Sequence, residues 1–179
     1  MRTLIKFGIY FFTGIILFFL HLTIINFLPY PINTINVLFI TLTVMIVIED
    51  RFAFIWFIVP MAFLLELFSV APFGSELLSL FLSAFAMRSI ILRFFTNRTI
   101  YIVLLTSVLG LIIYRVSYII ITLILGAIIH LPSQFSYAQF LFFGWETILS
   151  SIFASIIYII FSKRYRQYNP NYLIAKNRL

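Results

Sequence analysis

Apolar residues dominate the chain in six long runs, separated by charges, prolines or clusters of polar residues. The runs cover Phe7–Leu28, Asn33–Ile48, Phe52–Ser69, Ser75–Phe95, Thr99–Ile129 and Ala138–Phe161. None of them alternates apolar and polar residues as the strands of a membrane barrel do. A helix needs about 20 apolar residues to cross a bilayer. We therefore predict six membrane-spanning helices, of which the second is short and the fifth is long enough to be tilted or broken.

The composition is that of a membrane protein. Of the 179 residues, 64% are hydrophobic and 9% are charged, whereas soluble domains carry about 25% charged residues. The chain contains no cysteine, so disulfides are excluded. Basic residues precede the first run, as in a signal peptide, but this run is longer than the roughly 7–15 apolar residues of a signal sequence. We interpret it as a retained first span.

Lysines and arginines predict the direction in which each span crosses. The connections after the first, third and fifth runs (PYPIN, VAPFG and HLPSQFSY) contain neither residue, whereas the other connections and both ends are basic. Because such residues collect on the cytoplasmic side, six spans place both termini in the cytoplasm. Residues 1–161 would form the transmembrane domain. Residues 162–179 would form a basic cytoplasmic tail, which either only fixes the topology or is also attracted to anionic membrane lipids. The net charge of +7 has the same explanation, so no nucleic-acid partner is expected.

Two arginines lie inside the predicted spans. Arg88 is near the cytoplasmic end of the fourth span, and we expect its long side chain to reach the lipid headgroups. Arg115 lies deep in the fifth run. An isolated arginine at the centre of a span costs roughly 2.5–3.5 kcal/mol, so Arg115 needs an acidic partner. Glu66, Glu76 and Glu146 approach it from the extracellular side, and we predict that the four residues form a polar cluster in the outer half.

Two interpretations of this cluster remain open. A charge inside a membrane commonly marks a functional site, but one arginine and up to three acids would also lock four helices together. Glu76, in the first turn of its helix, is favoured by the helix dipole in either case. His21 and His130 have no second ligand at helical spacing, so no metal site is predicted. The chain has no catalytic or cofactor-binding motif, and we expect neither an enzyme nor a cofactor.

A short turn links the third and fourth spans. Pro72 fixes its own backbone angle, Gly74 permits a left-handed conformation, and Ser75 is a possible N-cap. Phe73 completes this Pro-Phe-Gly turn. Small residues recur every three or four positions on the fourth and sixth spans, where they favour close packing of helices. These residues are Ser75, Ser79 and Ser83 on the fourth span, and Gly144, Thr147, Ser151 and Ala154 on the sixth.

An acid late in the third span, followed by a Pro-x-Gly turn that opens the fourth, resembles the rod-shape-determining MreD family. That family often has G-x-x-x-D-L followed by a Pro-Leu-Gly turn at this place. Here Leu65-Glu66-Leu67-Phe68-Ser69 and then Pro72-Phe73-Gly74 stand in those positions, with Pro31 shortly before the second span. The sequence departs from the family in having Glu66 instead of aspartate and Phe63 instead of the preceding glycine. It is therefore similar to a divergent member.

The resemblance implies a fold and a function. The fold would be all-α, a six-helix transmembrane bundle resembling the substrate-binding subunit of energy-coupling-factor transporters. The protein would lie in the bacterial cytoplasmic membrane as a non-catalytic scaffold of the machinery that builds the lateral cell wall. Its implied partner is an MreC-like single-span protein, and indirectly a penicillin-binding transpeptidase and the actin-like MreB. Glu66 and the turn would then preserve the shape of the outer cavity.

The main alternative is a substrate-binding subunit of a vitamin-type transporter, which would bind a small molecule in the outer half of the same six-helix form. Such subunits typically carry a stripe of small residues on the first helix that docks to a coupling partner. The first span instead reads FGIYFFTGIILFFLHL, with Gly8 and Gly14 and no such stripe. An unrelated helical bundle, including an enzyme, is the remaining alternative.

Overall fold

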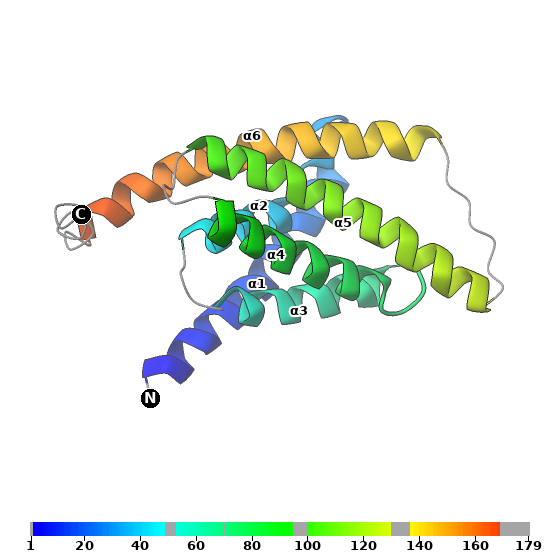
Figure 1. Cartoon of the computed structure of the whole chain (residues 1–179), viewed down its shortest axis with the longest axis horizontal. Helices are drawn as coiled ribbons and strands as arrows, with labels where there is room; N and C mark the ends of the chain where they lie inside the picture. The colour runs from blue at the N-terminus through cyan, green and yellow to red at the C-terminus, as the bar shows by residue number, and fades with distance from the viewer. Residues whose placement is uncertain (1, 49–52, 70, 95–99, 130–136, 169–179) are drawn as a thin grey trace.

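A computed structural model describes residues 2–48, 53–69, 71–94, 100–129 and 137–168. In this part of the chain the protein is all-helical (Figure 1). The α-helices are α1 (Arg2–Phe27), α2 (Val37–Ile48), α3 (Ala53–Phe68), α4 (Ser75–Phe94), α5 (Ile100–Ile129) and α6 (Tyr137–Tyr168), and a single 3-10 turn, η1 (Ile32–Thr34), precedes α2. The start of α1 and the end of α6 lie on the same side, the left, of the view in Figure 1.

Helix α2 lies at the centre of the bundle, and its neighbours are α1, α3, α4, α5 and α6. Its side chains are buried on every side, and Leu42, Ile46 and Val47 are completely inaccessible. A helix that is apolar all round belongs in an interior of this kind. At 12 residues it is only about 18 Å long. Because the other helices surround it, α2 does not have to match the thickness of a bilayer by itself.

The other helices pack in sequence order around α2, with α1 against α3, α3 against α4, α4 against α5, and α5 against α6. Small residues allow the closest approaches. A Cβ at Gly14 on α1 would lie 3.0 Å from the Phe57 carbonyl oxygen on α3. A Cβ at Gly110 on α5 would lie 2.7 Å from Cγ of Met87 on α4. Ser75, Ser79 and Ser83 all lie on the buried face of α4, as the small-residue spacing predicts.

Three helices are long and apolar enough to cross a membrane: Ser75–Arg93, Ile100–Ile128 and Gln139–Phe161. The segments Gly8–Ile24, Val37–Val47 and Phe54–Phe68 are apolar but shorter. The outer surface carries many large apolar side chains, among them Phe12, Ile16, Leu92 and Ile128. A soluble monomer rarely exposes contiguous apolar patches larger than a few hundred Å². These features together indicate a membrane protein.

The helices differ from the predicted runs in several places. Helix α5 is one continuous helix of 30 residues, so of the two alternatives for the long fifth run, tilted or broken, the break is excluded. The second run begins with η1, and the α-helix itself starts only at Val37. Helix α6 continues to Tyr168, past the predicted boundary of the tail at Phe161. His130, the acids Glu49 and Asp50, and residues 169–179 of the predicted tail lie outside the described part.

Candidate functional site

An ion pair joins the middle of α5 to α6. Arg115 Nε donates to Glu146 Oε2 at 2.8 Å, and Nη2 donates to the same oxygen. The guanidinium also lies over the rings of Phe143 and Tyr114, at 4.4 and 5.0 Å from their centres. Glu146 is 2% exposed and the Arg115 side chain 18%. Two ring faces and a carboxylate therefore replace the water that this cation loses on burial.

Asn36 completes the environment of Glu146. Its Nδ2 donates to Glu146 Oε1 at 2.8 Å, so each carboxylate oxygen of Glu146 has its own donor. Asn36 Oδ1 accepts the Phe39 N–H at 3.0 Å and so caps α2. The Asn36 backbone N–H donates to Ser150 Oγ at 2.9 Å. The sequence analysis missed this residue, although an asparagine directly before an apolar helix is a recognisable N-cap signal.

Glu66 bonds to the backbone of the turn that follows α3. Its Oε1 accepts the Gly74 N–H at 2.7 Å and its Oε2 accepts the Leu77 N–H at 2.9 Å. The carboxylate, which is 4% exposed, therefore holds the turn closed and satisfies the free amides at the start of α4. Ser75 does not act as the N-cap, because its buried Oγ has no hydrogen-bond partner.

The Pro-Phe-Gly turn has the predicted conformation at its glycine. Gly74 has φ +98°, in the left-handed region that glycine enters without a Cβ clash. The Ser75 N–H donates to the Pro72 carbonyl at 3.2 Å and the Leu78 N–H to the Gly74 carbonyl at 3.0 Å. The Phe73 side chain points outward and is 71% exposed. The turn and Glu66 thus form one hydrogen-bonded unit.

Glu76 accepts a hydrogen bond from the Tyr114 hydroxyl on α5. Its charge lies near enough to interact with those of Arg115, Glu66 and Glu146. Of the four residues predicted to form the polar cluster, the structure thus brings Arg115 and Glu146 into direct contact. Glu66 accepts hydrogen bonds from two backbone amides, and Glu76 accepts one from a tyrosine hydroxyl.

Arg88 corrects a second expectation. Its side chain is 7% exposed and does not reach outward. Nη1 donates instead to the Ile46 carbonyl near the end of α2, at 3.4 Å. The last four carbonyls of a helix lack partners within it, and a cation is favoured at that end of the dipole. The Arg88 side chain is therefore held inside the bundle, next to the free carbonyls of the short helix α2, and does not extend to the lipid headgroups.

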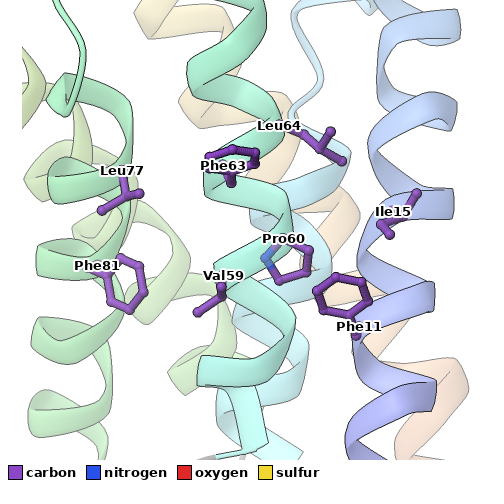
Figure 2. Close-up of a pocket in the computed structure, with 8 residues that line it drawn as sticks. All are labelled: Phe11, Ile15, Val59, Pro60, Phe63, Leu64, Leu77 and Phe81. Carbon is purple, nitrogen blue, oxygen red and sulfur yellow. The ribbon is translucent and has the colours of Figure 1, made fainter.

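An apolar groove lies on the face formed by α1, α3 and α4 (Figure 2). Leu77, whose N–H bonds Glu66, is one of its lining residues. It has a volume of about 440 Å³. Two residues of α1, four of α3 and two of α4 line it: Phe11, Ile15, Val59, Pro60, Phe63, Leu64, Leu77 and Phe81. Pro60 lies inside α3, where it donates no backbone hydrogen bond. Such a lining suits an apolar occupant.

Comparison with known proteins gives a negative result. No protein-family model, curated protein or solved structure matches this chain.

Within the described ranges, no three His, Asp or Glu side chains are grouped so that they would hold a metal ion. His21 is packed in the interior at 7% exposure. The geometry therefore offers two features for function: a set of charges bonded mainly to the protein itself, and an apolar groove on the outer face.

Proposed function

We propose that this protein is a non-catalytic scaffold of the bacterial cytoplasmic membrane, spanning it six times with both termini in the cytoplasm. It acts in the machinery that elongates the wall of rod-shaped cells. An MreC-like single-span protein is its direct partner. The penicillin-binding transpeptidase and actin-like MreB are reached through that partner.

One observation carries this proposal. The residues that resemble the MreD family, Glu66 and the turn Pro72-Phe73-Gly74, act together, because the carboxylate bonds to the amides of Gly74 and Leu77. Both carboxylate oxygens of Glu66 therefore serve to hold the shape of the turn. An acid with this role fits a scaffold better than a subunit that needs free polar groups for a substrate.

The apolar groove is a second observation that supports the same proposal. Its floor is α3 and its walls are α1 and α4 (Figure 2). Between helices in lipid, association depends on close van der Waals packing. A large apolar side chain on a partner's single transmembrane helix would fill the groove between Phe11, Val59 and Phe81. We therefore place the partner helix on this face.

The direct test is affinity purification of the full chain from the membranes of its host. The expected result is co-purification of a single-span protein with a coiled coil, and rounding of rod-shaped cells on depletion. Val59→Trp, which fills the groove, should reduce recovery of that partner at least tenfold. Ile156→Trp, at an exposed position on α6 outside the groove, is the matched control and should leave recovery unchanged.

The alternative function gives a different outcome in the same experiment. A vitamin-type transporter subunit would co-purify with two ATPases and a coupling protein, or would carry a bound small molecule. Either finding would refute the scaffold proposal. Recovery of the single-span partner that is equal for Val59→Trp and Ile156→Trp would keep the scaffold but reject the groove as its contact face.

A further inference from the structure

Helices α3 and α4 contact each other on both sides of the apolar groove along their length. Next to the turn, Glu66 Oε2 on α3 accepts the Leu77 N–H on α4 at 2.9 Å. Further along both helices, the rings of Phe54 on α3 and Phe85 on α4 pack edge to face, with their centres 5.9 Å apart. The groove residues of α3 lie between Phe54 and Glu66 in the sequence, and those of α4 run from Leu77 toward Phe85. The separation of α3 and α4 along the groove is therefore fixed at both ends.

Leu77 belongs both to the contact beside the turn and to the groove. Its backbone N–H is bonded to Glu66, because the first N–H groups of a helix have no partner within that helix. Its side chain lines the groove together with that of Phe81, and Figure 2 shows both on the α4 side, across from Phe63 on α3. Phe81 in turn stacks on Phe85, with ring centres 6.4 Å apart. A shift in the first turn of α4 would therefore move this wall of the groove.

The opposite wall of the groove is fixed by a close contact between helices. Gly14 on α1 lies against α3, where a Cβ would be 3.0 Å from the Phe57 carbonyl oxygen and 3.3 Å from Cγ of Pro60. Pro60 is itself a lining residue. Steric contact thus sets the position of α1 against α3, whereas a carboxylate sets the position of the first turn of α4.

We propose that Glu66 is a positioning residue for the partner helix: it holds Leu77 and thereby sets the width of the groove before the partner binds. This inference rests on the proposed function, since it takes the groove as the contact face. Glu66 is 4% exposed, so it acts through Leu77 and not by touching the partner. A surface that is already ordered binds more tightly, because ordering side chains on association costs affinity.

The width of the groove can be measured without a partner. The chain contains no cysteine, so nitroxide labels can be attached to the full chain at Leu67→Cys and Leu78→Cys. These positions adjoin Glu66 and Leu77 and are 58% and 52% exposed. Pulsed electron paramagnetic resonance in lipid nanodiscs should give a narrow distribution of distances. Glu66→Gln should broaden it and shift its mean by about 1–2 Å, the size of helix shifts at interfaces.

Arg88→Met is the control variant. Arg88 lies on the same helix as Leu77, but it bonds to the Ile46 carbonyl on α2. Its replacement also removes a hydrogen bond from the interior, so it lowers stability without releasing the first turn of α4. The label distances should therefore keep their wild-type values in Arg88→Met. An equal change in both variants, or no change in Glu66→Gln, would overturn the proposal.

Recovery of the single-span partner from membranes is the second measurement. Glu66→Gln should lower it about two- to tenfold, which corresponds to ordering one side chain on binding, and Arg88→Met should leave it unchanged. Leu77→Ala keeps the backbone bond to Glu66 but removes the side chain from the groove, so it should also lower recovery. Because Glu66 acts through that side chain, adding Glu66→Gln to Leu77→Ala should cause little further loss. Additive losses would overturn the proposal.

The two measurements distinguish failure of this inference from failure of the proposed function. If the wild-type chain recovers no single-span partner, the scaffold function is refuted, and the role of Glu66 in partner binding is refuted with it. If the partner is recovered but the label distances in Glu66→Gln match the wild type, only the positioning role is overturned.

Discussion

Arg115 Nε lies 2.8 Å from Glu146 Oε2, and this contact ties α5 to α6 within the part of the bundle that the sequence predicts to lie in lipid. Asn36 donates a hydrogen bond to the second oxygen of the same carboxylate. The start of α2 is therefore also linked to α5 and α6. Three segments far apart in the sequence thus meet at one carboxylate.

Arg115→Ala should therefore destabilise the protein by about 3–5 kcal/mol, because it leaves Glu146 buried without its cation. The measurement is thermal unfolding in detergent. A double-mutant cycle of Arg115→Ala with Glu146→Gln should give a coupling of at least about 1 kcal/mol. The same cycle with Glu66→Gln should be nearly additive, since Glu66 bonds to backbone amides. Additive effects for Arg115 and Glu146 would contradict the pairing.

Glu66→Ala removes the acceptor of two amides and should cost about 1–3 kcal/mol for each donor left buried without a partner. Glu66→Gln keeps one carbonyl oxygen and should lose roughly half as much. The adjacent Leu67→Ala, at a position 58% exposed, is the control and should have little effect. If Glu66→Ala unfolds at the same denaturant concentration as Leu67→Ala, the capping role is rejected.

Gly74→Ala should be destabilising by about 1–2 kcal/mol, since it places a Cβ at φ +98°, where the side chain clashes with the following carbonyl. Gly144→Ala is the matched control. A Cβ at Gly144 meets nothing within 4 Å, and alanine is the better helix former by about 1 kcal/mol. The two variants should therefore shift the unfolding temperature in opposite directions, and a shift of the same sign would contradict the turn geometry.

Arg88→Met should cost about 1–3 kcal/mol by removing a donor from the Ile46 carbonyl. Arg93→Met, on the same helix but exposed, should have little effect on stability. Hydrogen exchange followed by mass spectrometry provides a local readout, because loss of the donor should speed exchange at the end of α2 in Arg88→Met alone. Equal protection in both variants would show that Arg88 does not stabilise α2.

Much of the helical architecture can be predicted from the sequence, because apolar runs in lipid must satisfy their own backbone hydrogen bonds. The same holds for the left-handed glycine of the turn, since its conformation depends only on local sterics. The sequence also predicts that Arg115 needs an acid, because a buried cation without one is costly. Each of these three properties depends only on the type of residue and on whether lipid or water surrounds it.

Only the tertiary structure decided which acid serves which purpose. Glu66, Glu76 and Glu146 have the same side chain, so their roles depend on which donors lie within about 3 Å. Packing places amides next to Glu66, a tyrosine next to Glu76, and both Arg115 and Asn36 next to Glu146. Arg88 faces the free carbonyls of α2 for the same reason. The hydrogen-bond partner of each side chain depends on its neighbours in three dimensions, and the pattern of hydrophobic residues along the chain does not specify these neighbours.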